Sequence, residues 1–249
     1  MTSAAIVPTP EPPLSEASRV VNTFFAPSKT FRDINRSAMW WLPMLIIIVV
    51  SYAFIFVVEK KVGFDKVTEN TMRLSPKQMD KIDALPADQR EKQMEMITKF
   101  TKYGTYAYPV IALVVMVIMA LILWASYSFG AGAQIGFSKS MAVVVYGNLV
   151  TCVRAILAVI ALMAGADTDT FTFQNPVATS PAYFIDASQH PVLFALGSQF
   201  DITSIWAMIL VAIGFTYVTK VKKGTSFAIV FGWFAVLVLF SVGAAALRA

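Results

Sequence analysis

Five long apolar runs, separated by polar segments, dominate the hydropathy pattern of the chain. A helix rises about 1.5 Å per residue, so about 20 apolar residues cross the roughly 30 Å hydrocarbon core of a bilayer. The pattern therefore predicts an all-α membrane protein, a bundle of five transmembrane helices. The expected spans cover residues 39–58, 107–129, 141–164, 203–219 and 226–247.

The chain before the first span divides into two parts. Residues 1–17 contain four prolines and no helical period, which is typical of a disordered tail and unlike a signal peptide. Residues 18–38 form an interfacial basic segment, in which Ser28 is expected to cap a short helix. This segment either lies on anionic lipid or merely orients the first span. Its basic residues are Arg19, Lys29, Arg32 and Arg36.

Residues 59–106 are polar and predict a helical hairpin between spans 1 and 2. Ser75 and Pro76 are typical of a helix start, and Pro86 should end that first helix. A second helix is expected from Pro86 to about Thr101, before the second span begins. Ten basic and eight acidic residues nearly cancel here. The hairpin is therefore expected either to be simply solvated or to offer a docking surface.

Residues 165–202 connect the third and fourth spans and contain no Lys or Arg. They hold four aspartates among several aromatic residues, and Asp201 is expected to cap the fourth span. A segment of this length rarely stays without structure, so we expect it to pack over the spans. Residues 191–200 are expected to form a short helix.

The composition and the positions of the basic residues both fit a membrane protein. The chain is 57% hydrophobic and 14% charged, whereas a soluble domain carries about 25% charged residues. Its net charge of +5 comes largely from residues flanking apolar runs, which favours lipid contact and excludes nucleic acid as the expected partner. A cytoplasmic N-terminus places the basic segment 18–38, Lys139 and the 220–223 link inside. Lys60 and Lys61 would then be exceptions, on the outside.

Arg154 lies near the centre of the third span, where a charge costs about 2.5 kcal/mol or more. We take Arg154, Thr151, Asn148 and Tyr146 as a candidate intramembrane polar site. No Asp or Glu lies within the five predicted spans, so Arg154 has no obvious partner at its depth. It either binds a lipid phosphate or another anion, or it is a structural residue bonded to carbonyls or water. Gly147 and Asn148 either interrupt this span or lie in a plain helix.

Catalytic and metal chemistry have little support in the sequence. Cys152 is the single cysteine and His190 the single histidine, which excludes an internal disulfide and makes the common zinc sites unexpected. We recognise neither a nucleophile motif nor an acid–base pair within the spans. We therefore expect neither an enzyme nor a cofactor, and we take His190 as a surface loop residue.

Two segments carry a family resemblance. Phe25-Ala-Pro-Ser-Lys-Thr-Phe-Arg-Asp-Ile34, followed by Trp40-Trp41-Leu42-Pro43, resembles the start of bacterial members of the Yip domain family (Ypt/Rab-interacting protein). Val145-Tyr146-Gly147-Asn148 is similar to that family's Tyr-Gly-containing span. The resemblance covers about residues 20–247. It implies five spans, a cytoplasmic N-terminal region and, for a bacterial member, the inner membrane.

The resemblance leaves two functions open. Eukaryotic members bind prenylated Rab-type GTPases and shape or traffic membranes, while bacterial relatives have no assigned role. The first expectation is a non-enzymatic scaffold or adaptor, recruiting a protein partner through the N-terminal region or through Lys220, Lys222 and Lys223. The second is a small transporter or lipid- or anion-binding protein that uses Arg154. The oligomeric state stays open.

Overall fold

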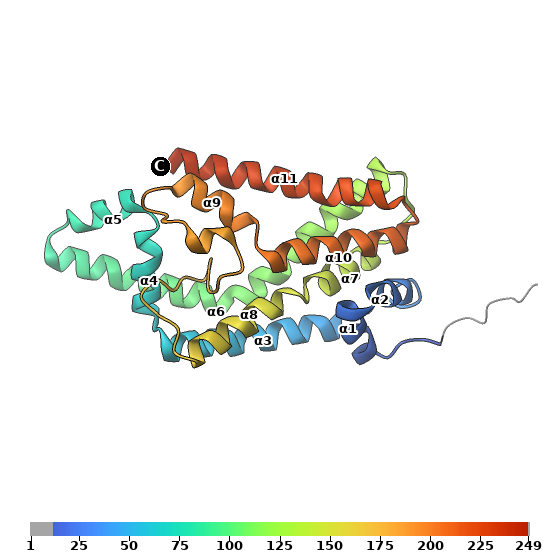
Figure 1. The fold of residues 1–249 in the computed structure, drawn as a ribbon, viewed down its shortest axis with the longest axis horizontal. Helices are drawn as coiled ribbons and strands as arrows, with labels where there is room; N and C mark the ends of the chain where they lie inside the picture. Colours follow the sequence, from blue (N-terminus) through green and yellow to red (C-terminus); the bar gives the residue numbers. More distant parts are fainter. Residues whose placement is uncertain (1–11, 249) are drawn as a thin grey trace, which may run out of the picture.

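The computed structural model of the protein describes residues 12–248, and within that range every regular element is a helix, which confirms the all-α prediction. Figure 1 shows an elongated bundle with α1 and α2 at one end and α4 and α5 at the other. The helices are α1 (Glu16–Phe25), α2 (Pro27–Asp33), α3 (Trp41–Lys61), α4 (Phe64–Arg73), α5 (Pro76–Asp83), α6 (Ala87–Ala125), α7 (Phe137–Asn148), α8 (Thr151–Met163), α9 (Pro191–Gln199), α10 (Ile202–Thr219) and α11 (Lys223–Arg248), with a π-helical turn η1 (Ser126–Gly130) and a 3-10 turn η2 (Pro181–Phe184).

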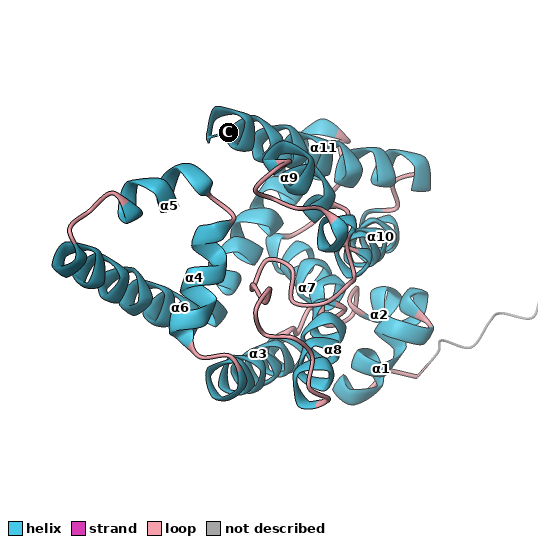
Figure 2. Cartoon of the chain, turned by 60° about the vertical axis from the view of Figure 1, so that its left-hand side comes forward, coloured by secondary structure: helices cyan, strands magenta, loops and turns pink. Residues whose placement is uncertain are grey.

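Five of these segments are long and apolar enough to cross a membrane, in agreement with the five predicted spans. Figure 2 shows α7 and α10 near the middle of the bundle, between α3 and α8 on one side and α11 on the other. The residues from Ser140 to Gly147 on α7 are all buried, so this helix forms the centre of the core. The spanning segments are Trp41–Lys61, Ala87–Gly130, Phe137–Met163, Ile202–Thr219 and Lys223–Leu247.

The second span and the polar hairpin are joined differently from the prediction. The first hairpin helix, α5, ends before Pro86 as expected, but α6 does not stop near Thr101 and runs unbroken to Ala125. The residues after Thr101 hold one glycine, Gly104, which costs only about 1 kcal/mol, and the helix continues through Pro109. The helix therefore passes from the polar segment directly into the span.

The third span is interrupted at its centre, between α7 and α8. The N–H groups of Leu149 and Cys152 donate to carbonyls three residues back, at 3.2 and 3.1 Å, where an α-helix would use the fourth. The Asn148 amide donates to the Val144 carbonyl and the Thr151 hydroxyl to the Asn148 carbonyl, at 2.8 and 2.7 Å. Side chains that bond to the local backbone in this way compete with helical hydrogen bonding. Of the two alternatives, the structure has the interrupted span.

The N-terminal segment folds against the bundle. α2 begins at Pro27 with Ala26 as its N-cap, so the prediction that Ser28 caps this helix is wrong; proline is favoured in the first helical turn. Phe31 and Ile34 share one side, as their spacing predicts, but both are fully buried in the protein core and do not face lipid. Of the expected tail, residues 1–11 lie outside the described range, and α1 already begins at Glu16.

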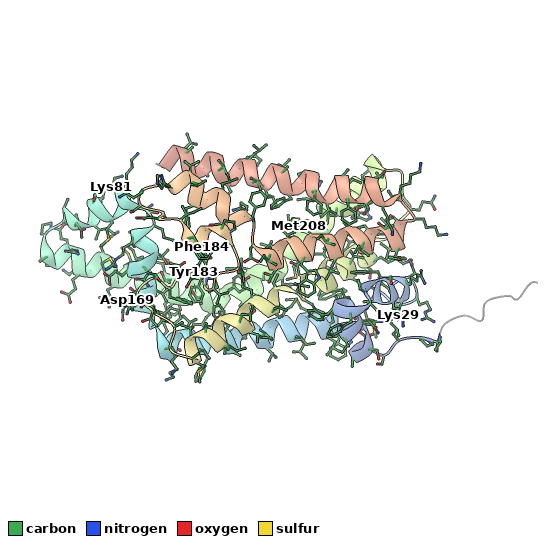
Figure 3. The ribbon with its side chains drawn as sticks, in the orientation of Figure 1. Lys29, Lys81, Asp169, Tyr183, Phe184 and Met208 are labelled. Carbon is green, nitrogen blue, oxygen red and sulfur yellow. The ribbon has the colours of Figure 1, made fainter. Side chains whose placement is uncertain are left out.

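The connection between α8 and α10 packs over the spans, as predicted. Phe171 and Phe173 contact Phe54 of α3 edge to face, with ring centroids 6.4 and 5.8 Å away. Asn70 of α4 donates to the Thr168 and Phe171 carbonyls, both at 3.0 Å. The hairpin and this connection therefore meet at the same end of the bundle, where Figure 3 shows Lys81 and Asp169, while Lys29 lies at the opposite end.

Candidate functional site

A cavity of about 560 Å³ lies between α3, α6 and α8, beneath the connection between α8 and α10. Most of its wall is apolar, and Arg154, Asn148 and Thr151 contribute polar groups. Tyr108, Ile111 and Val115 line it from α6 while keeping about half of their surface exposed, so the cavity opens sideways along this helix. Cavities of about 300–1,000 Å³ are typical of small-molecule sites.

Arg154 has an acidic partner that the sequence did not indicate. Its Nη1 lies 3.7 Å from Oδ2 of Asp201, the residue directly before α10, so the expectation that Arg154 has no such partner at its depth is wrong. The reason is that the connection folds back into the bundle and carries Asp201 to the level of Arg154. At 3.7 Å the contact is an ion pair without a hydrogen bond. Within the part of the chain that the structure describes, residues 12–248, the Arg154 side chain has no hydrogen-bond partner.

Asp201 also accepts hydrogen bonds from residues next to it. As predicted, it caps α10, since Oδ1 accepts from the Thr203 and Ser204 N–H groups at 2.9 and 3.1 Å. Its Oδ2 accepts from the Thr179 hydroxyl at 2.5 Å. The hydrogen bonds from the Thr179 and Thr203 hydroxyls and the charge of Arg154 favour the ionised form of Asp201. The carboxylate therefore stays ionised beside Arg154.

A second cavity of about 290 Å³ lies on the other side of the interruption, between α6, α7, α10 and α11. Its wall shares Val115, Met116, Asn148 and Thr151 with the first cavity. The two cavities therefore adjoin at the point where the third span is broken. Asn148 and Thr151 stand between them.

Three of the four predicted site residues thus come together, and Tyr146 does not. Tyr146 is fully buried before the interruption and faces α1, where its hydroxyl donates to Oε2 of Glu16 at 3.1 Å. It lines neither cavity. Tyr146 belongs instead to a separate charged cluster, and its inclusion in the Arg154 site is wrong. His190 is exposed in the connection, as predicted.

That charged cluster is centred on Arg19, which was expected to be one of several surface basic residues. Only 3% of Arg19 is exposed, and its Nε donates to Oδ2 of Asp33 at 2.6 Å. Its Nη1 donates to Glu16 and to the Ser37 carbonyl, at 3.0 and 3.1 Å. Burial raises the pKa of Asp33, but the hydrogen bonds from Arg19 and Arg36 outweigh it and lower the pKa. This cluster ties α1 to α2; it is distinct from the two cavities.

Comparison with known proteins agrees with this architecture. The family model for the Yip1 domain matches residues 21–245. No curated protein and no solved structure matches the chain. The matched range begins within α1, contains the interrupted span and both cavities, and ends near the end of α11. With nearly all of its length matched, this integral membrane chain with five membrane-spanning segments belongs to the Yip1 domain family.

Proposed function

We propose that this Yip1 family protein binds an anionic membrane lipid in the Arg154 cavity and is not an enzyme. The observation that carries the proposal is a guanidinium without a hydrogen-bond partner among residues 12–248, on the wall of a largely apolar cavity. Guanidinium binds phosphate through paired, charge-assisted hydrogen bonds, and an apolar wall suits an acyl chain. A ligand that carries both groups matches this cavity better than a soluble anion does.

The surroundings of the cavity support lateral entry of a lipid. The half-exposed residues of α6 on its wall face the region that the bilayer would occupy, so a chain can enter without crossing the protein. The nearby interruption of the third span places the polar side chains of Asn148 and Thr151 on the cavity wall. Asp201 balances the charge of Arg154 from 3.7 Å, a distance that leaves the guanidinium donors available.

The proposal predicts that Arg154→Leu loses anionic lipid. Losing a charge-assisted hydrogen bond costs about 1.5–3 kcal/mol, so binding should weaken by about tenfold or more, while Arg154→Lys should retain part of it. The measurement is native mass spectrometry of protein purified in mild detergent, with titrated phosphatidylglycerol. Arg90→Leu, on the exposed hairpin and away from the cavity, is the matched control. Equal phosphatidylglycerol binding by wild type and Arg154→Leu would mean that Arg154 is structural.

We further propose a cytoplasmic N-terminus and a bacterial inner-membrane location. The end of the bundle built from residues 12–40, 130–140 and 219–224 carries eight basic and two acidic residues. The opposite end carries eleven basic residues, ten from 59–106 and Arg248, with eight acidic residues from 59–106 and four from 165–202. The positive-inside rule counts Lys and Arg in short segments, so we base the assignment on the three short basic segments of the first end and on the Lys- and Arg-free segment 165–202 of the other, with the longer segment 59–106 as the exception.

Cysteine labelling tests this orientation. In a Cys152→Ala background, Gln189→Cys and Lys222→Cys each place one thiol at an exposed position, at opposite ends of the bundle. An impermeant thiol reagent added to intact spheroplasts should label position 189, whereas position 222 should react only after the membrane is opened. The reverse pattern would mean that the N-terminus is outside.

An adaptor role is the second candidate, favoured by the exposed basic surface at the proposed cytoplasmic end. We define this basic surface as Lys29, Arg32, Lys220, Lys222 and Lys223, all of which are exposed. It is suited to an acidic protein partner. The purification described above separates the two candidates. A stoichiometric protein partner kept by both wild type and Arg154→Leu, without any Arg154-dependent lipid, would favour the adaptor.

A further inference from the structure

We infer that the ligand is a two-chain anionic phospholipid. One acyl chain lies in each of the two cavities, and the glycerol lies where the cavities meet. This inference rests on the proposed function and adds the class of the lipid ligand. It uses the second cavity, which the Arg154 site alone does not explain. The lipid's phosphate would lie against Arg154, on the wall of the first cavity.

The shared wall carries the first step of the argument. Val115 and Met116 of α6, with Asn148 and Thr151 at the interruption of the third span, border both cavities. A ligand with one chain would fill one cavity and leave the other empty or open to lipid. A ligand that branches at the junction fills both, and glycerol with two ester-linked chains is such a branch point.

The character of the second cavity gives the second step. Two of its polar wall residues are bonded within the protein, since Gln199 donates to Ser241 at 3.0 Å and the Ser198 hydroxyl donates to the Phe194 carbonyl at 2.8 Å. The Ser204 hydroxyl and part of the Asn148 amide are left. Much of the remaining wall is Met, Leu, Val and Phe. The second cavity therefore has little left to offer a charged headgroup, and its surface suits an acyl chain.

Asn148 gives the third step. One of its amide hydrogens bonds to the Val144 carbonyl at 2.8 Å, whereas its second hydrogen and its carbonyl oxygen have no partner among residues 12–248. Asn148 is partly buried at the junction, and its groups without partners stay accessible there. An ester carbonyl of the ligand would accept the free amide hydrogen. Arg154, Thr151 and Asn148 then follow the lipid from phosphate to ester along one side of the span.

The test compares a lipid that has one acyl chain with a lipid that has two. Dioleoyl phosphatidylglycerol and its single-chain lyso form are titrated into the detergent-purified protein, and binding is measured by native mass spectrometry. Wild type should bind the two-chain lipid about tenfold or more tightly than the lyso form, because a buried acyl chain adds binding free energy in proportion to its apolar area. Met208→Trp, which fills the second cavity from α10, should remove this preference, and Met208→Leu should keep it.

The outcomes separate this inference from the proposed function. Leu237→Trp narrows the second cavity from α11 and replaces Met208→Trp in the test if that variant does not fold. Equal wild-type affinity for the two lipids, or an unchanged preference in a folded Trp variant, would overturn the two-chain inference. The dependence on Arg154 would survive both results. If Arg154→Leu changes the binding of neither lipid, the proposed function itself fails.

Discussion

Asp33→Asn is expected to lower the free energy of unfolding by about 3–5 kcal/mol, the cost of breaking a buried ion pair. Asp33 is only 3% exposed and accepts from Arg19 and Arg36, and the Arg19 side chain is buried with it. Asparagine removes the negative charge and leaves the Arg19 guanidinium buried beside a neutral group. The measurement is thermal unfolding in detergent, followed by tryptophan fluorescence.

Asp65→Asn is the matched control, because Asp65 is an exposed aspartate near the start of α4 and should change stability little. The pKa of Asp33 is lowered, so its contribution is fully present above the unfolded value of about 3.9 and is lost as the pH falls through the lower folded value. Wild type should therefore lose stability below about pH 4, and Asp33→Asn should lack this part of the decline. Equal changes in the melting temperature of Asp33→Asn and Asp65→Asn would mean that the charged cluster around Arg19 does not hold α1 and α2 together.

Gly214→Ala is expected to destabilise the bundle by about 1–3 kcal/mol, the usual cost of overpacking a core. A Cβ at this position would lie 2.6 Å from Cγ1 of Val143 and 2.8 Å from Cε1 of Phe31. Both neighbours are fully buried, so neither can move aside cheaply. The close approach of α2, α7 and α10 thus depends on the absence of a side chain at residue 214.

Gly232→Ala supplies a control of opposite sign. Gly232 lies inside α11, and a Cβ there would meet nothing within 4 Å. Alanine is a better helix former than glycine, so this variant should gain about 0.5–1 kcal/mol. Apparent melting temperatures in the same detergent compare the two. A Gly214→Ala protein as stable as Gly232→Ala would contradict the packing argument.

Local sequence signals predicted the local structure well. Long apolar runs predicted the five spans because burial in a bilayer depends on length and hydropathy alone. The Asp201 cap was also predicted, since it joins residues within one helical turn.

Contacts between distant segments could not be predicted in the same way. Arg154 and Asp201 meet only because the connection between α8 and α10 folds back into the bundle, and its length predicts that it packs over the spans but not which residues it brings together. Arg19 resembles any basic residue that flanks a span, and its burial depends on how α1 and α2 pack. The site therefore required tertiary structure, although Arg154, Asn148 and Thr151 were identifiable from their position in an apolar run.

The length of α6 couples the outside of the membrane to the cavity. Its 39 residues extend about 58 Å, whereas the hydrocarbon core is about 30 Å thick, so nearly half of the helix projects beyond that core. The stretch from Phe100 to Met116 on this helix lines the cavity, and it contains Pro109, whose nitrogen donates no hydrogen bond. A single continuous helix therefore carries both the segment that projects beyond the bilayer and one wall of the cavity.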